Sequence, residues 1–313
     1  MTKVVEFEVH YSAFLSPEGK LVKPLPDGAP DAEELTSLYR MMVLTRAFDA
    51  KAIALQRTGR LGTYASSLGQ EAVSIGIGRA MDPCDVLLPS FRDHGTQLYR
   101  GVSMTELFLY WGGDERGSSF QGPTEDFPVS VTVGGHAPQA TGVALAFKLR
   151  REPRVAVCIF GDGASSKGDV YEAMNMAGSW QVPVVFVVNN NQWAISTPRA
   201  EQSATATLAQ KAIAAGFQGE QVDGNDTIAV SNSVGNAVAA ARKNGQPALI
   251  ECLTYRLGDH TTADDASRYR DDDEVSRWWQ KDPLARLRLH LTRNHGWNRE
   301  REQATLSSCR DHA

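Results

Sequence analysis

The chain has 313 residues, 42% of them hydrophobic and 22% charged, so it is long enough to bury a large globular core. Its formal net charge of -5 argues against nucleic acid as a partner. No apolar run approaches the roughly 18 residues that a membrane span needs. The first residues also lack the apolar segment of a signal peptide. We therefore expect a soluble, cytoplasmic protein without a membrane partner.

The four cysteines are Cys84, Cys158, Cys252 and Cys309, and no two of them form a CxxC pair. Cys158 and Cys252 lie inside apolar runs, where a buried thiol behaves as a small hydrophobic side chain. This usage of cysteine predicts a reducing compartment and no structural zinc.

Residues 1–30 are interrupted by prolines and glycines, and we expect them to form an extended arm. Asp31 is a candidate N-cap for a helix over residues 33–56, because acidic residues open this stretch and apolar residues recur in it at helical spacing. The segment RTGRLG, residues 57–62, is expected to end this helix.

Farther along the chain, apolar runs of strand length alternate with helical stretches. This alternation is typical of an α/β fold, a doubly wound and mostly parallel sheet with helices on both faces. The predicted strands are residues 85–90, 155–160, 182–188 and 247–255. The charged stretch 270–291 predicts an acidic turn followed by an amphipathic helix. We expect an arm at 1–30, one domain at 31–300 and a polar, fraying tail at 301–313.

Polar residues follow two of the predicted strands directly. Gly161, Asp162 and Gly163 come after the strand 155–160, and Asn189, Asn190 and Asn191 come after the strand 182–188. The helical stretch between the strands makes this a βαβ unit, whose parallel strands end at the same edge of the sheet. Ligands bind beyond that edge in doubly wound sheets. Asp162 and Asn191 are therefore expected to meet there.

A carboxylate with an amide oxygen suits Mg²⁺, which commonly completes its coordination with phosphate and water. Gly161 and Gly163 would allow a phosphate to approach the backbone, and the start of the following helix would offer N–H groups to it. Either segment alone is also compatible with an ordinary turn. Together, in one βαβ unit, they favour a clamp for a diphosphate and magnesium.

The spacing of Gly-Asp-Gly, 26 residues, and then Asn190-Asn191 resembles the thiamine diphosphate motif of thiamine-dependent enzymes. Residues 59–72 (GRLGTYASSLGQEA), 90–95 (SFRDHG), 190–198 (NNQWAISTP) and 255–270 (YRLGDHTTADDASRYR) narrow the resemblance. They are similar to the α subunit of the E1 component of 2-oxo acid dehydrogenase complexes. The resemblance covers about residues 30–300 and implies the thiamine diphosphate-binding fold.

The resemblance also implies roles for individual residues. The magnesium ligands would be the Asp162 carboxylate, the Asn191 amide oxygen and the Trp193 main-chain oxygen. The other residues implied at the cofactor are Gly161, Gly163 and Ala164 at the diphosphate, Val131 and Val133 beside the aminopyrimidine ring, and Phe91, Arg92 and His260. Phe91 stands where the family commonly has Tyr, and Asn189 where some relatives have Arg.

Three histidines are candidates: His94 and His260 fall in the segments that carry the resemblance, and His136 lies elsewhere in the region that the resemblance covers. His260 would border the cofactor and act in acyl transfer, because an imidazole can change charge near neutral pH and pass a proton. His94 and His136 are weaker candidates, and we expect His136, where relatives often have Gln, to be structural.

The reaction implied is the decarboxylation of a 2-oxo acid on thiamine diphosphate, with transfer of the acyl group to the lipoyl arm of an E2 acyltransferase. The glutamate that activates the cofactor belongs to a second domain in this family, so we expect a β subunit and an α2β2 tetramer. Pyruvate is favoured as the substrate. A branched-chain 2-oxo acid dehydrogenase, an acetoin dehydrogenase and a non-catalytic binding protein with this fold stay open as alternatives.

Overall fold

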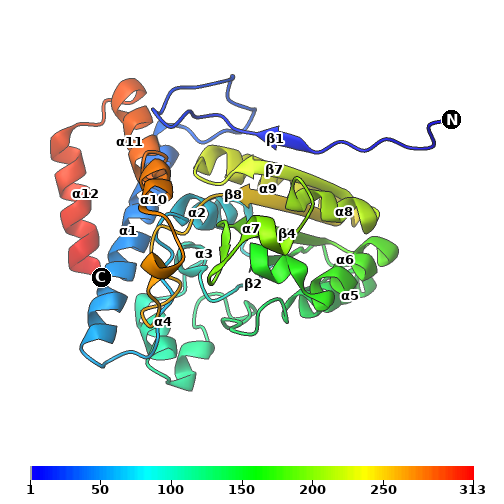
Figure 1. The fold of residues 1–313 in the computed structure, drawn as a ribbon, viewed down its shortest axis with the longest axis horizontal. Coiled ribbons are helices and arrows are strands. Elements are labelled where there is room, and N and C mark those ends of the chain that lie inside the picture. Colours follow the sequence, from blue (N-terminus) through cyan, green and yellow to red (C-terminus); the bar gives the residue numbers. More distant parts are fainter. Residues whose placement is uncertain (1) are drawn as a thin grey trace.

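The computed structural model describes residues 2–313, which build a six-stranded parallel sheet surrounded by helices (Figure 1). The strand order is β1-β7-β8-β4-β3-β2. The strands are β1 (His10–Ser12), β2 (Val86–Leu88), β3 (Ala156–Gly161), β4 (Val184–Asn190), β7 (Gln218–Asp223) and β8 (Ala248–Leu253). This architecture confirms the predicted α/β class with a parallel sheet.

Helices cover both faces of the sheet, and the sheet separates two cores. In β3, Val157 and Ile159 pack into one core with α1 (Ala32–Arg57), α2 (Glu71–Ala80) and α9 (Thr227–Asn244). Cys158 and Phe160 point the other way, toward α5 (Ala137–Arg150) and α6 (Gly168–Trp180). Because successive side chains of a strand alternate between faces, a strand buried on both faces must be apolar throughout. This explains the continuous apolar runs in the sequence.

The remaining elements are short or peripheral. They are α3 (His94–Tyr99), α4 (Met104–Trp111), η1 (Glu115–Ser118), η2 (Asp162–Ser166), β5 (Trp193–Ala194), β6 (Thr197–Pro198), α7 (Arg199–Gln202), η3 (Leu208–Gln210), α8 (Lys211–Ala214), η4 (Ala266–Arg268), α10 (Asp272–Trp279), α11 (Pro283–Asn294) and α12 (Arg299–His312). Within residues 2–313, no helix combines the length and the hydropathy required to cross a membrane.

The predicted first helix is confirmed as α1, with Asp31 as its N-cap. The Asp31 carboxylate accepts a hydrogen bond from the Glu34 N–H at 2.9 Å, which satisfies one of the free donors at the helix start. The helix ends at Arg57, inside the predicted stop signal. The four predicted strands also appear, as β2, β3, β4 and β8.

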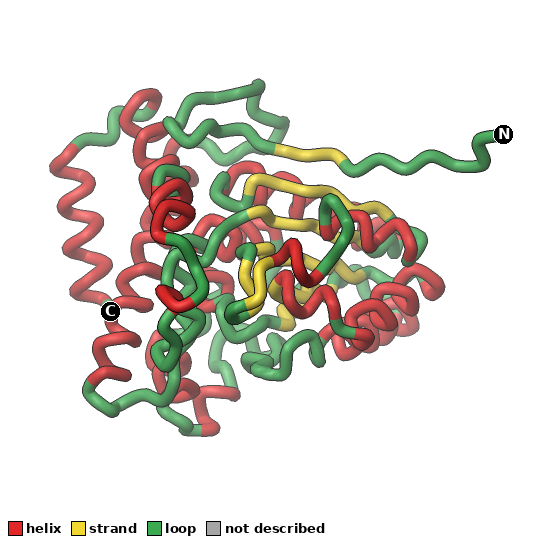
Figure 2. Tube along the Cα trace, viewed as in Figure 1, coloured by secondary structure: helices red, strands yellow, loops and turns green. Residues whose placement is uncertain are grey.

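The N-terminal arm differs from the expectation because its residues 10–12 form strand β1. This strand extends the sheet by pairing in parallel with β7, with His10 opposite Glu220. Beyond it, the Asp226 carboxylate accepts the N–H groups of Phe14 and Leu15, both at 2.7 Å. Neither strand has the apolar pattern that the prediction required, because β7 (QGEQVD) is only partly buried and β1 is at the edge. Residues 2–9 extend away from the body (Figure 2).

The expected fraying tail is wrong, because residues 299–312 form the helix α12. Asn298 caps the helix by accepting the Arg301 N–H at 2.9 Å. Glu302 then accepts from the Tyr39 hydroxyl of α1 and from the Trp297 indole, both at 2.8 Å. These contacts between distant parts of the chain hold a helix whose own sequence is too polar to indicate it. The single amphipathic helix expected in 270–291 is two helices, α10 and α11, separated before Pro283.

Candidate active site

A cavity of about 630 Å³ lies beyond the carboxyl ends of β2, β3, β4 and β8. The eleven residues that the sequence assigned to a cofactor or metal all line it: Phe91, Arg92, Val131, Val133, Gly161, Asp162, Gly163, Ala164, Asn191, Trp193 and His260. The parallel pairing of β3 with β4 sets Gly161 opposite Asn189, which brings the two polar segments to one edge. The structure therefore brings the predicted site residues together, while their individual roles stay predictions.

Asp162 follows β3 and begins the 3-10 helix η2, so that its carboxylate is buried at the cavity. Burial raises the pKa of Asp162 to about 6, although a hydrogen bond from the Gln202 amide, at 3.1 Å, opposes the shift. A buried carboxylate in such surroundings is stabilised by a cation. The position is therefore suited to a metal ligand.

Asn191 and Trp193 follow β4 in a tight turn. The Asn191 amide nitrogen donates to the Gln70 side-chain oxygen at 3.2 Å, and the Asn191 amide oxygen accepts the Trp193 N–H at 3.3 Å. The Trp193 main-chain oxygen accepts from Arg256 at 3.2 Å. A carbonyl oxygen has a second lone pair that remains for another partner.

The donor set at this edge therefore consists of one carboxylate, one amide oxygen and one main-chain oxygen. The described residues include no cluster of three or more His, Cys, Asp or Glu side chains that could hold a metal by themselves. Hard oxygen donors in this number fit Mg²⁺ that takes its other ligands from phosphate and water. The residues present therefore fit the magnesium and diphosphate that the sequence indicated.

The two glycines beside Asp162 differ in whether the fold leaves room for a side chain. A Cβ atom on Gly163 would lie 2.6 Å from the Ala194 Cβ, so a side chain does not fit there. A Cβ on Gly161 would meet no protein atom within 4 Å, although this residue lines the cavity. The helix that was expected to start directly after Gly163 is α6, and it begins only at Gly168 because the 3-10 helix η2 comes first.

Arg92 and His260 form a second polar group in the cavity. The Arg92 guanidinium donates to the Ser66 oxygen at 2.5 Å and to the His260 oxygen at 2.9 Å, and it lies 3.2 Å from the His260 Nδ1. Arg256 approaches the same Nδ1 at 3.3 Å. Burial and then the charge of Arg256 lower the pKa of Arg92 to about 10, so Arg92 stays charged at pH 7. Two neighbouring guanidiniums make this part of the cavity suited to an anion.

His260 does not titrate near neutral pH in this environment, contrary to the expectation from its side chain alone. Burial, followed by the charges of Arg92 and Arg256, lowers its pKa to about 4, and Asp264 opposes the shift. Because guanidinium groups only donate hydrogen bonds, the Nδ1 of His260 must be the acceptor. The ring proton therefore lies on Nε2. A neutral His260 can donate this proton to an anion.

Apolar side chains line the opening of the cavity. Val131, Val133 and Ile195 are 61%, 47% and 55% exposed, and all three line it. Contiguous exposed apolar residues at a cavity mark a surface for a ligand or a partner.

The two weaker histidine candidates are structural. His94 is buried and accepts the Trp111 indole N–H on Nε2 at 3.0 Å, and burial lowers its pKa to about 3. His136 is buried with its Nε2 at 2.7 Å from the Ile159 oxygen. Neither side chain lines the main cavity. The structural expectation for His136 agrees with this position.

Sequence reasoning missed several residues that line or support the cavity. Gln70, Trp111 and Gln202 line it, and Arg256 lies behind His260. Gln70 and Arg256 belong to segments that carried the family resemblance, so their proximity to the site could have been inferred. Gln202 comes from α7, beyond the β5–β6 hairpin, and no local pattern indicates that it reaches Asp162.

Comparison with known proteins agrees with this geometry. The family model described as "Dehydrogenase E1 component" matches residues 39–312. The chain belongs to this family. Enzymes of the dehydrogenase E1 family depend on thiamine diphosphate in general.

Individual members of the dehydrogenase E1 family are similar over most of the chain. A protein of Acholeplasma laidlawii named "Pyruvate dehydrogenase E1 component subunit alpha" is 42% identical over 286 residues, which are 91% of this chain and 83% of the relative. A protein of the same name from Staphylococcus aureus (strain Mu50) is 42% identical over 91% of this chain and 78% of its own length. The namesake from Staphylococcus epidermidis is 40% identical over 95% and 80%.

Proposed function

We propose that this chain is the α subunit of a thiamine diphosphate-dependent 2-oxo acid dehydrogenase E1 and that pyruvate is its substrate. The observation that carries the proposal is the single cavity that gathers all eleven expected site residues. The names of the relatives support pyruvate over the alternatives.

The chain would hold the diphosphate end of the cofactor. Asp162, Asn191 and the Trp193 oxygen would bind Mg²⁺, and Arg92 with the N–H donor of His260 would bind the phosphate oxygens. Val131 and Val133 would contact the aminopyrimidine ring, because they present apolar surface at the cavity opening. When bound, thiamine diphosphate supplies the carbon nucleophile and the electron sink that decarboxylation needs.

His260 would supply a hydrogen bond rather than a positive charge. Its Nε2 proton is oriented by the two guanidiniums at Nδ1. This arrangement allows a neutral His260 to donate a hydrogen bond from Nε2 to a developing oxyanion.

The site is expected to be completed by a β subunit. Among residues 2–313, the acidic side chains that line the cavity are Asp93 and Asp162, and no glutamate is among them. The exposed Val131, Val133 and Ile195 would be covered by that partner. The proposed assembly is an α2β2 tetramer that passes its acyl product to the lipoyl group of an E2 acyltransferase.

The substrate can be tested by reconstituting the chain with its β subunit and comparing pyruvate, 2-oxoisovalerate and acetoin. The highest kcat/KM is expected for pyruvate. A preference for 2-oxoisovalerate or acetoin would instead assign a branched-chain or acetoin enzyme. Activity of the chain without any β subunit would overturn the shared site. Failure of thiamine diphosphate and Mg²⁺ to bind the αβ assembly would revive the non-catalytic alternative.

A further inference from the structure

Gln70 is fully buried at the edge of the candidate site, and its side chain faces Asn191 rather than its own helix. It is the N-cap residue of α2 but makes no side-chain capping bond. Its Oε1 instead accepts the Asn191 amide N–H at 3.2 Å, and the residue lines the cavity. A capping bond from this position would help the helix start, so its absence calls for another reason for this side chain.

The contact with Gln70 decides whether the oxygen or the nitrogen of the Asn191 amide points toward the metal-binding edge. Gln70 receives the nitrogen of the amide, so the oxygen must point to the other side, where it also accepts the Trp193 N–H at 3.3 Å. If both amides were reversed, the Asn191 NH₂ group would face the Trp193 N–H, and two donors would meet. The orientation with the oxygen outward is therefore the one that the surroundings support.

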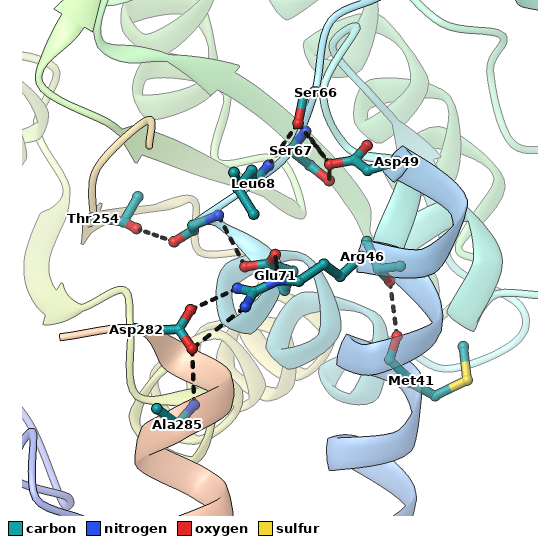
Figure 3. Close-up of polar contacts among 12 residues, drawn as sticks. Met41, Arg46, Asp49, Ser66, Ser67, Leu68, Glu71, Thr254, Asp282 and Ala285 are labelled. Carbon is teal, nitrogen blue, oxygen red and sulfur yellow. Dashed lines mark hydrogen bonds and ion pairs between the residues drawn. The ribbon is translucent and has the colours of Figure 1, made fainter. Parts of the chain in front are cut away.

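The loop that carries Gln70 is held by polar contacts on both sides (Figure 3). Before it, the Asp49 carboxylate accepts the Ser67 N–H and the Ser66 hydroxyl, both at 2.8 Å. After it, Glu71 accepts from Arg46 at 2.7 Å, and Arg46 also donates to Asp282 at 2.6 Å.

The same loop is joined to Thr254, which directly follows β8, the neighbour of β4 in the sheet. The Thr254 hydroxyl donates to the Gly69 oxygen at 3.0 Å (Figure 3), and the Thr254 N–H donates to the Asn190 oxygen at 2.9 Å. Gly69 adopts a φ of +92°, and a Cβ there would lie 2.6 Å from the Tyr255 oxygen. The distance between the Gln70 and Asn191 backbones is therefore fixed before any ligand binds, which is how supporting residues orient ligands of a metal.

The other end of the Gln70 amide points to the same conclusion. Its Nε2 is buried and has no hydrogen-bond partner among residues 2–313. An unpaired buried donor destabilises the folded chain. Because Gln70 lines the cavity, this donor can be satisfied by a group bound there.

We propose that Gln70 is a positioning residue that turns the Asn191 amide oxygen toward the metal that this edge of the cavity would bind. The proposal rests on the magnesium and thiamine diphosphate site described under the proposed function. It adds to that site a residue that does not itself touch the metal.

The test measures how much Mg²⁺ is needed for thiamine diphosphate to bind the assembly of this chain with its β subunit. Calorimetric titrations at fixed cofactor and increasing Mg²⁺ compare the wild type with Gln70→Met, which keeps the length of the side chain but removes both amide groups. We expect the half-saturating Mg²⁺ concentration to rise about tenfold, which corresponds to about 1.4 kcal/mol. The thermal midpoint of the ligand-free chain should not fall.

Gln97→Met is the matched control. Gln97 is also buried, and neither of its amide atoms has a partner within residues 2–313, but it does not line the cavity. Its replacement should leave the Mg²⁺ requirement within about twofold of the wild type. If Gln70→Met does not fold, Gln70→Asn gives a second test, because its shorter amide cannot reach Asn191.

The outcomes separate this inference from the proposed function. If the wild-type assembly does not bind thiamine diphosphate with Mg²⁺, the proposed function fails. If it binds and the Gln70 variants need the same Mg²⁺ as the wild type, the positioning role is rejected and the proposed function stands. An equal rise in Gln97→Met would also reject it, because any buried glutamine would then have the same effect.

Discussion

The Arg92 guanidinium contacts His260 at two atoms, the main-chain oxygen at 2.9 Å and the ring Nδ1 at 3.2 Å. This relationship fixes the orientation of the imidazole and keeps its proton on Nε2. It also joins the loop after β2 to the loop after β8, so two elements distant in sequence act as one anion-binding group. Both the charge and the geometry of Arg92 can be tested.

The depressed pKa of His260 predicts a pH dependence of stability. The folded-state pKa of about 4 lies below the ordinary value of 6.5, because of burial and then the charges of Arg92 and Arg256, with Asp264 opposing. The unfolded chain therefore takes up the proton first as the pH falls. The contribution of His260 is fully present above pH 6.5 and is lost as the pH falls through about 4.

The measurement compares the free energy of unfolding of the wild type and His260→Gln at pH 7.5 and pH 4.5. Glutamine can still accept from the two arginines but does not titrate. We expect the wild type to lose more stability on acidification than the variant. Equal losses in the two chains would show that His260 is protonated as easily when folded as when unfolded.

Arg92→Lys should weaken the binding of thiamine diphosphate by about 10-fold to 100-fold, because lysine keeps the charge but loses the planar fork that contacts Ser66 and His260 and would also bind phosphate. The measurement is a cofactor titration of the reconstituted assembly at saturating Mg²⁺. Arg268→Lys is the control, since Arg268 is exposed in the 3-10 helix η4 and, among residues 2–313, its side chain bonds only Asp265. An affinity for Arg92→Lys equal to that of the control would exclude Arg92 from the phosphate site.

The sequence predicted the central part of the fold because buried parallel strands are apolar on both faces, as β3 and β4 are. The proximity of Asp162 and Asn191 could also be predicted, because the parallel strands of a βαβ unit end at one edge of the sheet. The short strand β1, the polar strand β7 and the helix α12 were missed. Their stability comes from contacts across the fold, such as Tyr39 with Glu302, which no local pattern contains.

Prediction of the site had a similar limit. Residues in the loops directly after strands could be identified, because strand ends are readable from the sequence. Gln202 reaches Asp162 from a separate helix. The lowered pKa of His260 depends on burial and then on two arginines, one of them 168 positions away. Such properties depend on distances between loops, and these follow only from the folded chain.

Asp162→Asn should change the stability of the ligand-free chain and its affinity for the cofactor in opposite directions. Removing the buried negative charge is expected to stabilise the ligand-free chain by about 1–3 kcal/mol, because the amide is cheaper to bury than the carboxylate. The same change should raise the dissociation constant for thiamine diphosphate in the presence of Mg²⁺ at least about 100-fold, through loss of the one charged ligand. Denaturant unfolding of the chain and titration of the assembly measure the two effects. Unchanged cofactor affinity would reject Asp162 as a metal ligand.

The two glycines that flank Asp162 offer a matched pair of substitutions. Gly163→Ala places a Cβ 2.6 Å from the Ala194 Cβ and should destabilise the ligand-free chain by about 1–3 kcal/mol. Gly161→Ala meets no protein atom within 4 Å and should leave that stability nearly unchanged.

The binding of the cofactor should show a different pattern from stability. Gly161 lines the cavity, so a methyl group there would occupy space beside the diphosphate and lower the affinity about tenfold or more without unfolding the chain. Denaturant unfolding and a cofactor titration of both variants distinguish the two effects. If Gly161→Ala binds thiamine diphosphate as the wild type does, the diphosphate does not approach the backbone at the end of β3.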